Sequence, residues 1–463
     1  MIYIRTCAYN AEKTLERTIN SILNQTYGEY RYFILDNGSL DGTGEVLQKY
    51  AEKDSRIRPF YCEKNKDYSK NREFWKLSHN LEEEDLFCVL DADDVYEPTF
   101  LEEMLQFKNE NSLDIAICGS KFVDASSGMV YAERTLKDGL ILSNDQGFDF
   151  HFPEVHWNLR QVWGKLYSAK AAKAWYEIDF PEWFPKSYGR DTANVYESVK
   201  ASERIGVYNK PLHLYFVSSG SVSYKWHEGR EDSDFILFEK AKEVLIQKCG
   251  TVSQRNLNFL YAVQFNALKD TLNVLFGSDE TAEYKIEILK KIFENTITKQ
   301  TFLEKGGVSQ EEKMKFLTET VCGIIELAQR AEEKSLQNVT DICLVFNTDF
   351  SKLISAEQLG WYVKRLPVIV RNIALGEYEY GVNNLIVYIA KERDTNLMVD
   401  YPFLLGQMLA SLRNEEAKYV YFSKQLIRWC IENNELERAR RELNEWLQIL
   451  PEDKEFVAMD ELC

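Results

Sequence analysis

The first 125 or so residues alternate short apolar runs with stretches of helical periodicity. Five runs are expected to be strands: Ile2 to Thr6, Tyr32 to Leu35, Ile57 to Tyr61, Leu86 to Leu90 and Ile115 to Cys118. Between them, apolar residues such as Leu15, Ile19 and Ile22 recur at helical spacing. This alternation predicts an α/β domain with a mostly parallel sheet flanked by helices. Ligands bind such sheets beyond the carboxyl ends of the strands.

The second half of the chain has a different pattern. From about Asp232 onward, apolar positions follow one helical stripe after another, which predicts an all-α part. The polar, charged segment Lys225 to Asp232 separates the two styles. We therefore expect an α/β domain over residues 1–228 and an α-helical domain over residues 229–463.

The segment Leu436 to Pro451 is similar to the second helix of a tetratricopeptide repeat. It has that motif's small, apolar, bulky and closing residues at Ala439, Leu443, Trp446 and Pro451. A weaker version lies at Gly376 to Tyr388. This similarity predicts repeat-like helix pairs near the C-terminus, and the alternative is a helical bundle without repeats.

Charge and cysteine content narrow the class of protein. The chain has 56 Lys and Arg against 74 Asp and Glu, a net charge of −18, which disfavours a binder of nucleic acid or of an anionic membrane. Nine scattered cysteines without a C-x-x-C pair fit reduced thiols rather than a disulfide frame or a zinc site. Neither a signal peptide nor an apolar stretch of about 18 residues is apparent, so we expect a cytoplasmic protein without a transmembrane segment.

Asp36 follows a predicted strand and opens a turn-rich loop, Asn37 to Gly42. A carboxylate at this position can accept hydrogen bonds from the imide of a uracil base or from a ribose. The same side chain can instead close an Asx-turn within the loop. Spacing alone leaves both interpretations open.

Three carboxylates, Asp91, Asp93 and Asp94, lie within four positions after the run Leu86 to Leu90. Like charges so close together stay ionised only when a cation is near, and hard oxygen ligands suit Mg²⁺ or Mn²⁺. A metal ion here would let an acidic protein hold a diphosphate. The alternative is an exposed acidic helix start, with Pro98 opening the next helix.

Two further charged residues are candidates. Arg72 ends the segment Asn65 to Arg72 (NKDYSKNR) and can make a forked contact with phosphate oxygens, or it can be a solvated loop charge. Asp191, in Tyr188-Gly189-Arg190-Asp191, begins a helical run. It can act as a general base towards a substrate hydroxyl, or it can be a helix N-cap.

Together these segments resemble the family 2 glycosyltransferases with the GT-A fold, over about residues 1–225. The motifs that carry the resemblance occur in the family's order: Cys7-Ala8-Tyr9-Asn10, Ser21 to Tyr27 (SILNQTY), Asp36 to Gly42, Asn65 to Arg72, Asp91 to Asp94, Val162 to Tyr167 (VWGKLY), Arg190-Asp191, Pro211-Leu212 and Gly220 to Ser223 (GSVS). Each motif alone is weak, whereas their common order and spacing are specific.

The resemblance implies an inverting, metal-dependent transfer of a sugar from a nucleotide diphosphate sugar, with UDP-sugars favoured. The acceptor would be a hydroxyl of a saccharide or of another cell-envelope glycan acceptor. The implied nucleotide-binding residues are Ala8, Tyr9, Asp36, Asn65, Arg72 and Asp91. The resemblance further implies that Asp93, with Asp91, holds Mn²⁺ or Mg²⁺, that Asp191 is the catalytic base, and that Trp163 and Lys165 border the sugar or acceptor.

Five positions depart from the family's motifs: Cys7, Asn37, Asp67, Glu73 and Arg190. Arg190 matters most, because it replaces an acidic residue beside the implied base. A cation there either lowers the pKa of Asp191 and weakens it as a base, or indicates contact with an anionic acceptor. The acceptor is therefore less defined than the reaction.

Rival enzyme classes fit less well. A nucleotidyltransferase needs a basic phosphate loop, but the glycine cluster Gly38 to Gly44 has no Lys or Arg, and no G-x-G-x-x-G follows the first strand as a dehydrogenase would need. The remaining alternative is a non-catalytic helical scaffold with a degenerate nucleotide-sugar-binding domain. The intact aspartates argue against it. We expect the helical half to bind the acceptor carrier or to form a homo-oligomer, and His213 to be a strand residue rather than a metal ligand.

Overall fold

The computed structural model describes residues 1–144, 146–186, 188–217 and 225–304, and, with gaps, parts of 306–345 and 420–463. Its contacts form two compact units, Met1–Leu260 and Tyr261–Cys463. The predicted boundary at residue 228 falls just before the helix Arg230–Cys249, which packs within the first unit. The extent of the helical domain stays a prediction.

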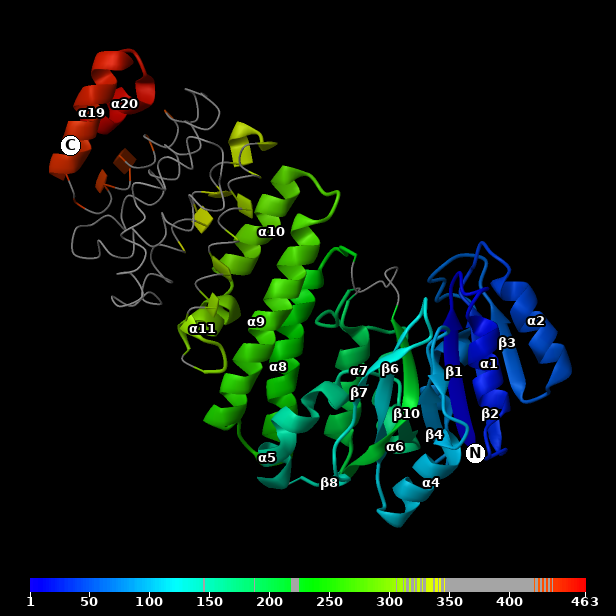
Figure 1. The fold of residues 1–463 in the computed structure, drawn as a ribbon. Coiled ribbons are helices and arrows are strands. Elements are labelled where there is room, and N and C mark those ends of the chain that lie inside the picture. The colour runs from blue at the N-terminus through cyan, green and yellow to red at the C-terminus, as the bar shows by residue number, and fades with distance from the viewer. Residues whose placement is uncertain are drawn as a thin grey trace. The chain divides into compact units, whose positions relative to one another are not determined.

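The first unit is built on a ten-stranded sheet (Figure 1). Its strands are β1 (Ile2–Ala8), β2 (Tyr30–Asp36), β3 (Ile57–Tyr61), β4 (Leu86–Val89), β5 (Val95–Tyr96), β6 (Ile115–Asp124), β7 (Val130–Arg134), β8 (Leu140–Leu142), β9 (Lys165–Ser168) and β10 (Ile205–Val217). The order is β3-β2-β1-β4-β9-β6-β10-β5, with β7 beside β6 and β8 beside β10. All five predicted strands are present.

Strand direction divides the sheet into two parallel parts. β3, β2, β1 and β4 are parallel neighbours, and so are β6 and β10. The short strand β9 lies between the two parts and runs antiparallel to both β4 and β6, so the sheet is mixed. Together with the flanking helices, this arrangement is the GT-A fold.

Helices connect and cover the strands. In the first unit they are α1 (Leu15–Leu23), α2 (Thr43–Lys53), α3 (Arg72–Trp75), α4 (Phe100–Glu110), α5 (Gln146–Val155), α6 (Ala169–Ala172), α7 (Arg190–Ala201) and α8 (Arg230–Cys249), with 3₁₀ turns η1 (Ser78–Asn80) and η2 (His156–Leu159). α1 buries Leu15, Ile19 and Ile22, the stripe that the sequence predicts. Each such side chain contributes about 1.5–3 kcal/mol on burial.

Strand register aligns the candidate residues at one edge of the sheet. Ala8 at the end of β1 pairs with Asp36 at the end of β2, and Arg5 pairs with Val89 in β4. Asp91 therefore follows β4 at about the level of the end of β1. Neighbouring strands are ~4.8 Å apart, which puts the backbones of Asp36 and Asp91 roughly 10 Å apart, with β1 between them. Figure 1 shows that β1 runs from the N-terminus, at the lower side of the view, towards the upper edge.

Gly189 and a packed leucine of α8 set the start of α7. Gly189, with φ +81°, caps the helix, so Asp191 lies in its first turn rather than at the cap. A Cβ on Gly189 would lie 2.9 Å from Leu237 Cδ1 of α8. Gly229, with φ +78°, in turn begins α8. α8 therefore packs directly against the turn that presents Asp191.

The second unit is helical where the structure describes it. It contains most of α9 (Gln254–Phe276), then α10 (Ala282–Glu294), α11 (Thr296–Leu303), the 3₁₀ turn η4 (Glu333–Ser335), α19 (Leu436–Ile449) and α20 (Lys454–Asp460). α19 covers the predicted repeat-like helix, and it buries Ala439, Leu443 and Trp446 against Phe456 of α20. The segment Gly376 to Tyr388 lies outside the described residues, so a repeat stays a prediction. None of the described helices is long and apolar enough to cross a membrane.

A buried ion pair joins β1 to the segment before α7. Arg5 Nη1 donates to Glu177 Oε1 at 2.8 Å, and the side chains are 15% and 2% exposed. The guanidinium lies 5.2 Å from the ring centre of Phe87 and 5.3 Å from that of Trp175. The neighbouring Tyr176 exchanges backbone hydrogen bonds with the Asn194 side chain of α7. The pair thus links the strand and the helix that carry candidate residues.

We predict that Arg5→Met lowers the free energy of unfolding by about 3–5 kcal/mol, because the Glu177 carboxylate is left buried without its partner. Arg5→Met combined with Glu177→Gln should recover most of this loss, since no buried charge remains. Lys170→Met, which breaks the exposed pair with Glu203 at 2.8 Å, is the control and should cost at most about 1 kcal/mol. Urea denaturation measures all three, and an Arg5→Met loss as small as the control's would contradict this account of the pair.

Candidate active site

The loop after β2 is folded tightly around Asp36. Asp36 is buried, and its Oδ1 accepts a hydrogen bond from Ser39 N at 2.9 Å, as in an Asx-turn. Its Oδ2 has no hydrogen-bond partner among the described residues. The Asx-turn and ligand binding are therefore compatible, because each uses a different oxygen. Gly38, with φ +76°, is required here, since a Cβ would lie 2.5 Å from the Lys64 carbonyl carbon.

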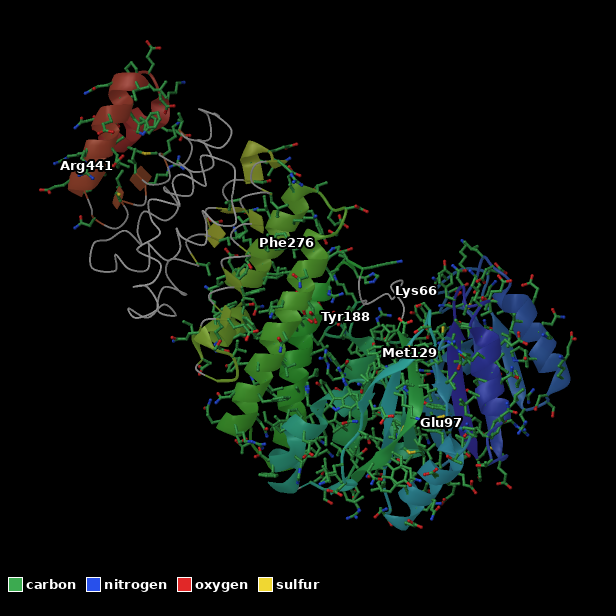
Figure 2. The ribbon with its side chains drawn as sticks, viewed as in Figure 1. Lys66, Glu97, Met129, Tyr188, Phe276 and Arg441 are labelled. Atoms are coloured by element: carbon green, nitrogen blue, oxygen red, sulfur yellow. The ribbon has the colours of Figure 1, made fainter. Side chains whose placement is uncertain are left out.

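Asn37 explains one departure from the family's motif. Its Nδ2 donates to Asn65 Oδ1 at 3.0 Å, and its Oδ1 accepts from Lys66 N at 3.0 Å. An amide can donate and accept at once, whereas an ionised aspartate can only accept. Asn37 thereby holds the 62–71 loop, in which Figure 2 labels Lys66, against the loop that follows Asp36. This contact brings Asn65 to the same sheet edge as Asp36.

The carboxylates after β4 form a cluster of like charge. Burial raises the pKa of Asp91 well above its ordinary value, and Asp94, Asp191 and Asp93 raise it further. Burial also raises the pKa of Asp93, although the nearby Arg17 opposes this shift. Asp191, at the start of α7, is thus within electrostatic range of Asp91 after β4, although the two residues are 100 positions apart in the sequence.

Asp94 and His213 form a buried pair beneath this cluster. Asp94 Oδ1 accepts from Phe216 N at 2.9 Å, and Asp94 Oδ2 lies 3.1 Å from His213 Nε2. The last two atoms are not aligned for a hydrogen bond, and neither has another partner in the described part of the chain. Burial, with help from Lys165, lowers the pKa of His213 to about 3, so the imidazole is neutral. His213 is thus a buried strand residue that contacts Asp94.

Two arginines from different elements lower the pKa of Asp191. Burial raises the pKa of its carboxyl group, while Arg5 of β1 and Arg190 lower it. The strand arginine is buried in its pair with Glu177, so its charge acts on Asp191 from within the protein. The two cations favour the ionised form that a general base needs.

Arg190 is held by the protein itself. Its Nε donates to Pro185 O at 3.0 Å, Nη2 donates to Lys186 O, and the guanidinium lies 4.4 Å from the ring centre of Phe180. Nη1 reaches Tyr68 Oη, in the 62–71 loop, at 3.4 Å. Of the two roles expected for this cation, the contacts favour the structural and electrostatic one over an open anion site.

Trp163 and Lys165 differ in exposure. The ammonium group of Lys165 is buried and donates to the carbonyls of Gln161 and Trp163, and burial lowers its pKa to about 7. Trp163 is partly exposed and stacks on His213 with ring centres 4.2 Å apart. Lys165 therefore supports the turn that presents Trp163, and only the indole can meet a ligand directly.

Sequence reasoning missed three residues near these groups. Tyr61 ends β3 opposite Asp36 and is 45% exposed. Arg17 donates to Asp93 O at 2.6 Å and lies 3.5 Å above the ring of Phe216. The position of Tyr61 at the end of a predicted strand could have indicated a site residue. Arg17 could not have been identified, because it is one of several polar residues on the solvent side of the predicted helix. The third, Arg5, is a charged residue inside an apolar strand, which could also have indicated a site residue.

The remaining predicted residues lie on the same edge. Ala8 is buried at the end of β1, with its carbonyl accepting from Asn37 N at 2.8 Å, and Tyr9 is 44% exposed. Arg72 is exposed at the start of α3. The structure therefore brings Asp36, Asn65 and Asp91 to one edge of the sheet, with β1 between Asp36 and Asp91, while the Arg72 side chain is exposed to solvent.

A divalent cation fits the chemistry of these groups. The donors are carboxylate oxygens. Burial raises the pKa of both Asp91 and Asp93, and neighbouring carboxylates raise that of Asp91 further; a bound cation would offset both effects. In the described part of the chain, no group of three His, Cys, Asp or Glu side chains is arranged to hold a metal ion. Mg²⁺ sites of the kind that one or two carboxylates share with substrate phosphates do not need such a group.

Comparisons with known proteins agree with this geometry. A family model described as Glycosyl transferase family 2 matches residues 3–148. Glycosyltransferase GlyA of Streptococcus pneumoniae is 26% identical over 316 residues, which cover 65% of this chain and 42% of GlyA. Glycosyltransferase GlyG of the same organism is 25% identical over 291 residues, which cover 60% of this chain and 90% of GlyG. Staphylococcus aureus TarS 1–349 in complex with UDP-GlcNAc aligns with a TM-score of 0.43 and 16% identity over 84% of this chain and 91% of that one.

The family match covers strands β1 to β8 and the candidate residues Asp36, Asn65, Arg72, Asp91 and Asp93. Asp191 and Trp163 lie beyond the family match. Residues 3–148 of this chain therefore match glycosyltransferase family 2, and they lie within the domain that has the GT-A fold.

Proposed function

We propose that this protein transfers a sugar from a nucleotide diphosphate sugar, with a UDP-sugar favoured, to a hydroxyl group of a saccharide or another cell-envelope acceptor, and that it inverts the anomeric configuration. The observation that carries the proposal is that the strand register sets Asp36 and Asp91 at one edge of the sheet, while the charge of Asp191 is among those that raise the pKa of Asp91. The first turn of α7, which carries the candidate base Asp191, is therefore within electrostatic reach of that edge. A nucleotide site and a proton acceptor are thus close enough to act on one substrate.

The donor half of the site is proposed to lie over the ends of β1 and β2. Asp36 Oδ2, which has no hydrogen-bond partner among the described residues, would accept from the base or ribose. The exposed rings of Tyr9, after β1, and Tyr61, at the end of β3, lie on either side of β2 and offer flat faces to a base. Asn65, fixed by Asn37, and the exposed Arg72 would meet the ribose and phosphates.

Asp93, assisted by Asp91, would hold Mn²⁺ or Mg²⁺ together with diphosphate oxygens. When bound, the cation supplies positive charge that stabilises the departing nucleoside diphosphate. Arg17 lies beside Asp93 and adds a fixed positive charge on the same side. A bound cation, together with Arg17, would offset the acidic groups of the site and so allow a diphosphate to bind to a protein with a net charge of −18.

On the acceptor side, Asp191 would accept the proton of the attacking hydroxyl. A direct in-line attack on the anomeric carbon needs one base and a stabilised leaving group, and it inverts the configuration. Arg5 and Arg190 lower the pKa of this exposed carboxylate and so favour its ionised form. Trp163 would border the sugar or acceptor, with Lys165 fixing its turn.

The second candidate is a non-catalytic scaffold that binds a nucleotide sugar. It shares the donor half and differs in that Asp191 would have no chemical task. We also propose a cytoplasmic location and, for the helical part, binding of the acceptor carrier or formation of a homo-oligomer. The stretch that matches GlyA covers 42% of GlyA's own length, so the full activity of such a relative is not carried over.

We predict that UDP with Mn²⁺ raises the melting temperature and that EDTA removes most of the increase. Ligand at about 100 times its Kd contributes about 2.7 kcal/mol to the folded state. Asp93→Asn should lose the metal-dependent part, whereas Asp149→Asn, a change in α5, should not. Absence of any shift with UDP, GDP or dTDP would contradict the donor site.

We predict that Asp191→Asn abolishes sugar transfer and slow donor hydrolysis, because the amide cannot accept the proton. The same variant should retain the UDP-induced thermal shift, since the donor residues lie on other elements. A panel of nucleotide sugars tested for hydrolysis provides the assay without knowledge of the acceptor. Turnover at the wild-type rate would require a different base.

We predict that Arg190→Gln moves the acidic limb of the pH–rate profile to higher pH. Arg190 lowers the pKa of Asp191, so its removal raises that pKa, and the base becomes protonated at a higher pH as the solution is acidified. Tyr68→Phe, which removes the bond to Arg190 but keeps the cation, should leave the limb in place. Equal profiles for wild type and Arg190→Gln would contradict the electrostatic role.

A further inference from the structure

A row of aromatic rings begins at the candidate site. Trp163 stacks on His213, with ring centres 4.2 Å apart at 22°, and on Tyr215, with ring centres 5.4 Å apart at 24°. His213 in turn lies 3.1 Å from Asp94 of the acidic segment. The first ring of the row is thus joined to the acidic segment through one side chain.

The row continues across β10, β6 and β7. Tyr215 and Phe122 are register partners on adjacent strands, with ring centres 5.6 Å apart. Tyr131 of β7 follows, with its ring centre 6.4 Å from that of Phe122. The guanidinium of Arg134 lies beside the row, 4.9 Å from the Phe122 ring centre and 5.0 Å from that of Trp157.

The far end of the row is open to solvent. All five residues of β7 are exposed, and Tyr131 is 59% exposed. Met129 and Val130, at the tip of the β6–β7 hairpin, are 67% and 47% exposed; Figure 2 labels Met129. Consecutive apolar side chains exposed on an edge strand indicate an interaction surface rather than core.

We propose that Trp163, Tyr215, Phe122 and Tyr131 form an extended acceptor subsite that binds a saccharide chain several residues long, with Arg134 hydrogen-bonding along its side. This inference rests on the proposed transfer reaction and adds to it that the acceptor is an oligosaccharide or polysaccharide. Flat rings pack on the C–H faces of sugars, and the rings here follow one another at 5.4, 5.6 and 6.4 Å, comparable with the length of one pyranose residue. Arg134 offers five N–H donors to hydroxyl or acidic groups of the chain.

Continuity with the candidate site selects this occupant over two others. An anionic membrane would be repelled by the net charge of −18 and by Glu133 within β7. A second copy of the chain could cover the exposed hairpin tip, but this would not explain why the row of rings continues to Trp163 at the candidate site. A saccharide acceptor must reach the reacting centre, so a row that starts beside it fits a chain whose end is being modified.

The experiment uses the full chain on an array of defined bacterial oligosaccharides and polysaccharides, from monosaccharides upward. We expect retention of at least one glycan of three or more residues, with binding that strengthens with length. Tyr131→Ala and Phe122→Leu should each weaken binding by roughly three- to tenfold, since an aromatic contact contributes about 0.5–1.5 kcal/mol. Phe150→Ala is the control, because it removes a 63% exposed ring elsewhere and should have no effect.

Several outcomes would overturn the inference. The inference would be wrong if the array retained no glycan, if binding did not depend on glycan length, or if Tyr131→Ala bound glycans as tightly as wild type. It would also be wrong if Tyr131→Ala changed the oligomeric state in light scattering and left glycan binding unchanged. The UDP and Mn²⁺ thermal shift of each variant separates the two proposals. If the thermal shift persists while the aromatic substitutions leave glycan binding unchanged, only the proposal of an acceptor subsite is wrong. If the wild-type protein shows no thermal shift, the proposed transfer reaction is itself contradicted.

Discussion

Parallel pairing of β1 with β2 and β4 is the constraint on which the candidate site depends. The register that pairs Ala8 with Asp36 and Arg5 with Val89 sets Asp36 and Asp91 at the same edge of the sheet. A shift of one residue would turn every side chain of β1 to the opposite face and would break this alignment. The buried Ile2 and Ile4 hold the register, because both would lose their packing in such a shift.

The site concentrates carboxylates that raise one another's pKa, and the fold compensates with fixed cations. Arg17 acts near Asp93, while Arg5 and Arg190 act on Asp191. Both arginines near Asp191 are held by protein groups, which keeps their charges in place before any substrate arrives. This arrangement is preorganisation: the cost of gathering the charges is met by folding, so that binding and reaction need little further rearrangement.

The fold and most of the donor side could be predicted from the sequence, because they follow from local patterns. Apolar runs predicted five of the six strands that the structure describes in the first 125 residues, all but the two-residue β5, and Asp36 and Asp91 follow directly after two of these runs. The Arg5–Glu177 pair and the clamp around Arg190 could not be predicted, since their partners lie 172 and 122 positions away along the chain. The buried state of Lys165 was also missed, because its partners are backbone carbonyls, which every sequence has.

The central claim is that the ends of β2, β1 and β4 and the first turn of α7 form one site for a nucleotide diphosphate and a divalent cation. Crystals grown with UDP and Mn²⁺, measured for anomalous scattering at the manganese edge, test it most directly. The account predicts a manganese peak in contact with the Asp93 carboxylate and the diphosphate, the base near Asp36, and Asp191 facing the β-phosphate side. A manganese ion bound elsewhere, or UDP bound away from Asp36, would contradict it.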